Sequence, residues 1–202
     1  MERWTAIVPV KGLEDAKSRL SAGAGRADWA LAFALDTVRA ARDAPGIRDV
    51  IVITDDERVR TALATAGLAA QVTADGGGGL NRCLARAADV CAGPVVMMLG
   101  DLPALTGPAV QTFIDFAEHN PVSFVADAHG TGTTMLAEHV RITPRFGERS
   151  RAAHSAVGYA EFTGATARLR RDVDDDIDLW DAIRLGVGPA TAALLARRSL
   201  DA

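Results

Sequence analysis

The sequence predicts an α/β fold built on a doubly wound, mostly parallel sheet. Three observations lead to this prediction. Short runs rich in β-branched residues are almost continuously apolar, as in strands that are buried on both faces of a parallel sheet. Segments with apolar residues at helical spacing separate these runs. Strand, helix and strand in that succession form right-handed βαβ units.

The first half of the chain alternates regularly. The apolar runs predict strands at Trp4–Val10, Asp49–Thr54, Ala70–Thr73 and Pro94–Leu99. The periodic segments predict helices at Ala27–Ala44, Glu57–Ala66 and Leu80–Cys91. Gly46 and Gly67 stand where the first two of these helices should stop.

The second half alternates less regularly. A helix is predicted at Pro108–His119, and two strands at Ser123–Ala126 and Thr133–Ala137 are joined by a turn at His129–Gly132. Residues Ile142–Ser150 form a predicted loop, Ala165–Arg170 a strand, and Leu179–Leu185 and Pro189–Arg198 two short helices. Because no repeat, low-complexity linker or boundary interrupts the chain, we expect residues 1–202 to form a single domain.

Composition restricts the possible functions. The 202 residues are 49% hydrophobic and 24% charged, ordinary values for a globular domain, which excludes disorder, collagen and a disulfide scaffold. With 22 basic and 26 acidic residues the formal net charge is −4. Such a chain has no global attraction for nucleic acid or anionic lipid, so an anionic substrate must be met by a local positive cluster.

Two features predict a cytoplasmic protein without a membrane partner. The apolar stretch Thr5–Val10 is short and runs into Lys11, and nothing approaches the roughly 18 apolar residues that a spanning helix needs. Cys83 and Cys91 are spaced like neither a zinc motif nor a redox pair, so both are expected to be free thiols.

Ligands of an open parallel sheet bind beyond the carboxyl ends of its strands, so the residues that follow each strand are the candidates. Lys11, Gly12, Lys17 and Arg19 follow the first strand, and Lys11 and Lys17 are the only lysines in the chain. Backbone amides and positive side chains together form a phosphate cradle. The loop is neither a Walker A motif nor G-x-G-x-x-G. The alternative is a solvated basic loop.

Four consecutive glycines, Gly76–Gly79, and then Leu80 and Asn81 follow the third strand. Glycines carry a large entropic cost, which indicates a backbone that approaches a flat ligand closely. Asn81 then offers a donor and an acceptor to a base or ribose. A flexible turn is the alternative.

Acidic residues predict a metal site. Asp101 follows the fourth strand, where packing does not require a carboxylate, and Mg²⁺ takes one or two carboxylates together with phosphate oxygens and water. Helix capping is the alternative for Asp101, although Thr106 is better placed to cap. One member of the later cluster Asp172–Asp178 that faced Asp101 would complete the site, and the other acids would be solvated or paired with Arg168, Arg170 and Arg171.

The segments Asp127–Thr134 and Arg145–Ser150 contain small hydroxyl residues, glycines and arginines, the components of a second anion site. Ser150 has an alternative role as the cap of a following helix. His129 and His154 could lie near this site, but a lone histidine is more often structural than catalytic. No arrangement of residues resembles a nucleophilic triad.

Together these motifs resemble the family of 2-phospho-L-lactate and phosphoenolpyruvate guanylyltransferases of coenzyme F-420 biosynthesis. The resemblance extends in order over nearly the whole chain, through V-P-V-K-G at 8–12, A-K-S-R-L at 16–20, G-G-L-N at 78–81, G-D-L-P-A-L at 100–105, A-D-x-x-G-T-G-T-T at 126–134, R-F-G-x-x-S at 145–150, His154, D-V-D at 172–174 and D-L at 178–179. One departure concerns Asp175 and Asp176, which replace the usual Thr-Pro.

The resemblance implies a Rossmann-like nucleotidyltransferase fold of the GT-A type with a small inserted β-region. It implies a transfer of GMP from GTP to a three-carbon phosphate with Mg²⁺ as the cofactor. The implied roles are Asp101 and Asp174 for the metal; Lys11, Gly12, Lys17 and Arg19 for the triphosphate; Gly79, Leu80 and Asn81 for the nucleoside; and Thr133, Gly147 and Ser150 for the acceptor. Lys17 and Asp101 would be the catalytic residues, and Asp172 remains an alternative to Asp174.

Two choices stay open at this stage. The alanine- and arginine-rich composition suggests an actinobacterial-type source, and in that branch the resemblance favours phosphoenolpyruvate over 2-phospholactate as the acceptor. A non-catalytic nucleotide-binding regulator is a more distant alternative, although it would have little use for two separated acidic metal positions. A dinucleotide-dependent oxidoreductase lacks its glycine fingerprint here. The activated product makes a hand-off to a downstream transferase an expectation.

Overall fold

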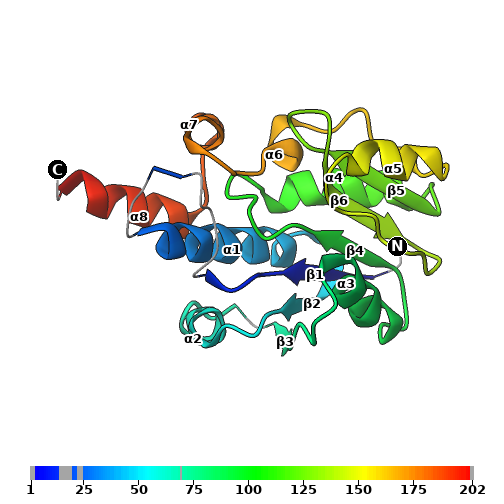
Figure 1. Ribbon diagram of the computed structural model, residues 1–202, viewed down its shortest axis with the longest axis horizontal. Coiled ribbons are helices and arrows are strands. Elements are labelled where there is room, and N and C mark those ends of the chain that lie inside the picture. The colour runs from blue at the N-terminus through cyan, green and yellow to red at the C-terminus, as the bar shows by residue number, and fades with distance from the viewer. Residues whose placement is uncertain (1–2, 14–19, 22–24, 69, 201–202) are drawn as a thin grey trace.

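A seven-stranded sheet forms the centre of the molecule (Figure 1). The computed structural model describes residues 3–13, 20–21, 25–68 and 70–200. The strands are β1 (Trp4–Pro9), β2 (Ile47–Ile53), β3 (Gln71–Thr73), β4 (Val95–Met98), β5 (Val122–Ala126), β6 (Thr133–Glu138) and β7 (Ala160–Glu161), in the order β3-β2-β1-β4-β6-β5-β7. Of these described strands β6 alone runs against the others, because it pairs antiparallel with β4 and β5.

Helices cover both faces of the sheet, as a doubly wound fold requires. They are α1 (Arg26–Arg42), α2 (Glu57–Thr65), α3 (Leu80–Asp89), α4 (Gly107–Ala117), α5 (Ser150–Ala156), α6 (Ala167–Arg170), α7 (Asp176–Leu185) and α8 (Pro189–Leu200). Alternate residues of β1 point to opposite faces. Val8 packs in one core with α1 and α4, whereas Ile7 packs in a second core with Leu84 of α3.

A third apolar cluster attaches the end of the chain to the sheet. Trp29 and Phe33 of α1 pack there with Ala182 of α7, Leu194 of α8 and Val173 of the connection before α7. Figure 1 shows α7 and α8 beside α1, at the end of the molecule opposite the N-terminus. This cluster therefore fixes the backbone that carries the acidic residues around Val173.

The predicted α/β fold with its mostly parallel sheet is confirmed. The strands and helices predicted in the first half are all present, with ends that differ by up to a few residues. The β5–β6 hairpin and β7 correspond to the predicted inserted β-region, but they extend the same sheet. Cys83 and Cys91 are free, as predicted.

One prediction in the second half is wrong. Ala165–Arg170 contains the short helix α6 instead of a strand, and Arg168 there donates to the carbonyls of Ala104 and Gly186. The predicted loop Ile142–Ser150 is confirmed as far as Arg149, and the helix α5, which was not predicted, begins at Ser150 without any side-chain cap. The helix predicted at Leu179–Leu185 is α7, which starts earlier, at Asp176, because Asp175 and Asp178 form a reciprocal capping box.

Glu138, at the end of β6, is a fully buried carboxylate. Its oxygens accept hydrogen bonds from the Arg141 guanidinium and the Ile142 amide, both at 3.3 Å. Burial nevertheless raises the pKa of Glu138 from 4.5 to about 7, and the nearby Arg141 only partly opposes this shift. Between these values the native carboxyl keeps its proton while the unfolded one loses it, so this group's stabilisation is lost as the pH rises from about 4.5 through about 7.

We therefore expect Glu138→Gln to flatten the pH dependence of stability. The wild-type free energy of unfolding should fall by about 2–3 kcal/mol more than that of the variant between pH 5 and pH 8. Urea unfolding of both proteins at the two pH values measures this difference. If the free energy of unfolding fell equally in the two proteins, that result would contradict a raised pKa at Glu138.

Candidate active site

Asp101 lies at the carboxyl end of β4, beside the end of β1. Gly100 allows this approach, because a Cβ there would lie 2.8 Å from the carbonyl oxygen of Pro9. The Val173 amide donates a 3.1 Å hydrogen bond to the Asp101 carbonyl and so brings the later acidic segment alongside. Asp172 and Asp174 flank Val173, whose side chain is completely buried. The carboxylates of Asp101 and Asp174 both act on the Asp172 carboxyl, so the three acids lie near one another.

Negative charge concentrates at Asp172. Burial, followed in order of effect by the carboxylates of Asp101, Asp174 and Asp127, raises the pKa of Asp172 from 3.8 to about 8. Its Oδ1 atom is buried and has no hydrogen-bond partner among the residues that the structure describes. A buried acceptor without a donor, surrounded by like charges, is an environment that a cation would stabilise.

These oxygens fit the chemistry of Mg²⁺. Within the described ranges, no group of three or more His, Cys, Asp or Glu side chains is already gathered as a metal cluster. Mg²⁺ does not require one, because it usually keeps several waters and binds through one or two carboxylates together with substrate phosphates. Asp101 with Asp172 or Asp174 therefore suits a metal that arrives with a nucleotide.

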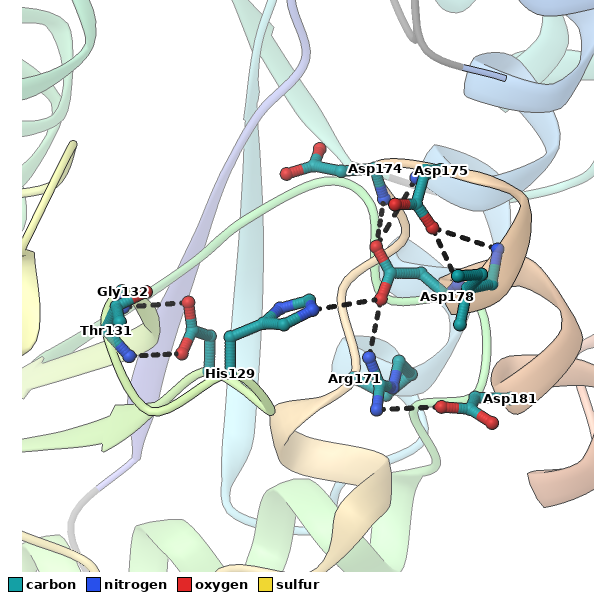
Figure 2. A network of polar contacts seen from close by, with 10 residues as sticks. His129, Thr131, Gly132, Arg171, Asp174, Asp175, Asp178 and Asp181 are labelled. Carbon is teal, nitrogen blue, oxygen red and sulfur yellow. Dashed lines mark hydrogen bonds and ion pairs between the residues drawn. The ribbon is translucent and has the colours of Figure 1, made fainter. Parts of the chain in front are cut away.

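Asp178, in contrast, is occupied by protein contacts (Figure 2). Its buried carboxylate accepts from Arg171 at 2.6 Å and from the amides of Asp174 and Asp175 at 3.1 and 3.3 Å. His129 Nε2 lies 3.6 Å from the same carboxylate. Figure 2 shows that Asp174 turns its own carboxylate away from this network. Asp178 therefore holds the backbone of Asp174 in place.

The predicted pairing of the three preceding arginines with the acidic cluster is correct for Arg171 alone. Arg171 bridges Asp178 and Asp181, at 2.6 and 2.9 Å. Arg168 donates to the backbone carbonyls already described, and Arg170 donates to the Asp127 carbonyl. These two guanidinium groups fasten loops instead of neutralising acids.

Asp127 shapes the turn that precedes β6. Its carboxylate accepts from the amides of Thr131 and Gly132 at 2.9 and 2.7 Å. A Cβ at Gly132 would lie 2.4 Å from that carboxylate, so the turn requires glycine there. This turn positions Thr133, which is the first residue of β6.

Thr133 contacts a buried histidine. The Thr133 hydroxyl and His154 Nδ1 lie 2.9 Å apart, and the Arg145 amide donates to His154 Nε2 at 3.2 Å. Burial, assisted by the charge of Arg145, lowers the pKa of His154 to about 4, so the ring is neutral near pH 7. Because Nε2 accepts, Nδ1 carries the proton and donates it to Thr133. The hydroxyl hydrogen of Thr133 is then left for another acceptor.

Gly147 and Ser150 lie in one tight turn. The Ser150 amide donates to the Gly147 carbonyl at 3.1 Å. Gly147 has φ 129°, and Arg149 adopts the left-handed region with φ 57°. Ser150 is the first residue of α5 and its side chain does not cap the helix, so the capping alternative for Ser150 is wrong. The structure thus brings Thr133, Gly147 and Ser150 together around α5 and His154.

The glycine-rich segment before α3 has an unusual backbone. Gly76, Gly77, Gly78 and Gly79 all have positive φ, between 66° and 89°. Arg86 of α3 braces the turn by donating to the Gly77 carbonyl at 2.8 Å and also to the Asp75 carbonyl. Only glycine adopts such angles without strain, so the conformation of this turn by itself accounts for the four glycines, with or without a ligand.

The remaining predicted binding residues fall into two groups. Lys11 and Gly12 are exposed directly after β1, and Leu80 is the first residue of α3. Lys17 and Arg19 lie outside the described residues, so their phosphate-binding roles stay predictions.

Asn81 already has partners. Its Nδ2 donates to the Phe146 carbonyl at 2.9 Å, and its Oδ1 accepts from the Phe146 amide at 2.8 Å. The sequence alone did not reveal this pair, since the two residues are 65 positions apart. It also did not reveal the structural roles of Asp127 and Asp178, although the Asp175–Asp178 spacing is a recognisable capping signal.

Comparisons with known proteins identify the family of the chain. The profile of the family described as "Guanylyl transferase CofC like" matches residues 4–156. The chain belongs to this family. A relative named phosphoenolpyruvate guanylyltransferase from Streptomyces coelicolor is 45% identical, over 96% of this chain and 97% of its own length. One of the same name from Salinispora arenicola is 43% identical, over 95% and 92%.

Solved structures show the same fold. A nucleotidyl transferase from Methanothermobacter thermautotroptrophicus superimposes with a TM-score of 0.62 at 19% identity, over 92% of this chain and 98% of that one. The 4-diphosphocytidyl-2C-methyl-D-erythritol synthase structure gives 0.63 at 10% identity, over 92% and 99%. The family match and the named relatives, together with this fold, make the protein an enzyme of the nucleotidyltransferase class. None of its described helices is long and apolar enough to cross a membrane.

Proposed function

We propose that the protein transfers GMP from GTP to phosphoenolpyruvate and releases pyrophosphate, as a step towards coenzyme F-420. The observation that carries this proposal is the acidic group of Asp101, Asp172 and Asp174 at the carboxyl end of β4, where the Val173–Asp101 hydrogen bond joins segments distant in sequence. The relatives' shared name supports the choice of acceptor.

The metal in this proposal is Mg²⁺, held by Asp101 together with Asp174 or Asp172. When bound, it would neutralise charge on the triphosphate and so stabilise the transition state electrostatically. Lys11, Lys17 and Arg19 would add positive charge on the phosphates. The glycine segment ending at Gly79 would present its backbone, together with Leu80, to the nucleoside.

The acceptor would lie by Thr133, Gly147 and Ser150. The Thr133 hydroxyl has a hydrogen left to donate because His154 already donates to its oxygen, and this hydrogen suits a phosphate oxygen of the acceptor. That acceptor oxygen attacks the α-phosphorus of GTP in line, the bond to the β-phosphate breaks, and pyrophosphate leaves. A phosphate monoester is mostly dianionic near pH 7, so the step needs no general base.

The choice of acceptor is tested by product mass. The protein is supplied with GTP, Mg²⁺ and either phosphoenolpyruvate or 2-phospholactate, and we expect a GMP adduct of phosphoenolpyruvate. Turnover confined to 2-phospholactate would overturn the acceptor and leave guanylyl transfer standing. GTP binding without any transfer would favour the regulator alternative. The activated diphosphate product also makes a hand-off to a downstream transferase part of this proposal.

A further inference from the structure

One short piece of backbone, Arg145–Phe146, is held from two sides. Asn81 in the first turn of α3 exchanges two hydrogen bonds with Phe146, at 2.9 and 2.8 Å. On the other side, His154 of α5 accepts from the Arg145 amide at 3.2 Å. The loop that leads into Gly147 is therefore fixed by side chains of two different helices.

The Asn81–Phe146 contact joins the segment proposed for the nucleoside to the segment proposed for the acceptor. Asn81 lies two residues beyond Gly79, in the segment proposed for the nucleoside. Phe146 directly precedes Gly147, in the segment proposed for the acceptor. A carboxamide has the same donor and acceptor groups as a peptide unit, so Asn81 pairs with Phe146 as a neighbouring strand would. A leucine of similar size offers neither group.

Aromatic rings pack around His154 and hold its contact with the Arg145 amide in place. His154 is completely buried, with its ring centroid 5.4, 5.8 and 5.7 Å from those of Phe124, Phe146 and Tyr159. The Phe146 side chain is itself buried in the core on the α3 face of the sheet. Displacing the Phe146 backbone would disturb this packing and the His154–Thr133 hydrogen bond together.

We propose that Asn81 is a positioning residue for the acceptor: it acts through the Phe146 backbone on Gly147, Ser150 and Thr133, although it lies in the nucleotide segment. The inference rests on the proposed function, because it takes those three residues as the acceptor site. It predicts that Asn81 affects the binding of the three-carbon phosphate more than the binding of GTP.

The test is steady-state kinetics of Asn81→Leu with both substrates varied. We expect the KM for phosphoenolpyruvate to rise about tenfold, the scale of one to two lost hydrogen bonds, and the KM for GTP to change less than about threefold. Asn120→Leu is the matched control, because Asn120 also donates from its amide to a backbone carbonyl, that of Phe116, at the end of α4. This control should leave both KM values unchanged.

Two further variants keep the test decisive. Asn81→Asp retains the oxygen that accepts from Phe146 and should raise the acceptor KM in the same direction if Asn81→Leu does not fold. His154→Phe keeps an aromatic ring but removes the other hold on the loop, and should also raise the acceptor KM. An active Asn81 variant with an unchanged acceptor KM, or with a GTP KM raised as much, would overturn the inference alone. A wild-type chain without transferase activity would overturn the proposed function and this inference with it.

Discussion

Asp101→Asn should lower the turnover of guanylyl transfer at least about a hundredfold while the protein still folds. Asp101 follows β4 after Leu99 and Gly100, and the hydrogen bond from the Val173 amide to the Asp101 carbonyl places it beside the Asp172–Asp174 segment. That contact uses backbone atoms, so an asparagine side chain preserves it. Loss of one preorganised charge-stabilising group at a reacting phosphate is of this magnitude.

The measurement is pyrophosphate release at saturating GTP and phosphoenolpyruvate, over a range of Mg²⁺ concentrations. Asp49→Asn is the matched control, because Asp49 is a partly exposed residue of β2 paired with its neighbour Arg48. Its turnover should equal that of the wild type. A folded Asp101→Asn protein with normal, Mg²⁺-dependent turnover would show that the metal site is misplaced.

Asp174→Asn and Asp172→Asn should each lower turnover by about a hundredfold, with different accompanying effects on stability. Both side chains flank the buried Val173, so both are placed to reach a shared cation. Asp172 is the more buried, and the charges of Asp101, Asp174 and Asp127 oppose its own. Removing its charge without metal relieves this repulsion, so Asp172→Asn should raise the melting temperature, whereas the exposed Asp174 should change it little.

Thermal melting with and without Mg²⁺ and GTP, beside the turnover assay, separates the two residues. If only one variant loses turnover and the Mg²⁺-dependent rise in melting temperature, that residue is the second ligand beside Asp101. This outcome decides between Asp172 and Asp174. Normal turnover in both variants would contradict a carboxylate pair across the Asp101–Val173 contact.

Sequence patterns predicted the elements whose signals are local. Strands β1, β2 and β4 are short, nearly continuous apolar runs, and their neighbours follow helical periodicity, so their identity depends on nearby residues. The two-residue β7 and the four-residue α6 are too short to show a period. Their conformations depend on partners far along the chain, such as the Ala104 and Gly186 carbonyls that accept hydrogen bonds from Arg168.

The same distinction applies to the site. Asp101 and the Asp172–Asp174 segment were predictable as candidates because strand ends of a parallel sheet meet at one edge. The partners of each side chain were not, because the competition among acids and arginines is decided by the fold. The Asp178 carboxylate accepts a hydrogen bond from Arg171, and the Asn81 side chain donates one to the backbone carbonyl of Phe146, 65 residues away. A polar side chain after a glycine run gives no sign of such a distant backbone partner.

In the proposed reaction the α-phosphate of GTP becomes joined to the phosphate of the three-carbon acceptor by a phosphoanhydride (P–O–P) bond. The most direct measurement uses GTP labelled at the α-phosphate in one reaction and at the γ-phosphate in another, each with phosphoenolpyruvate and Mg²⁺. We predict that the α-label moves to a product with the combined mass of GMP and phosphoenolpyruvate less one water, and that the γ-label appears in pyrophosphate. Release of the γ-label as inorganic phosphate, with the α-label retained in GDP, would contradict guanylyl transfer.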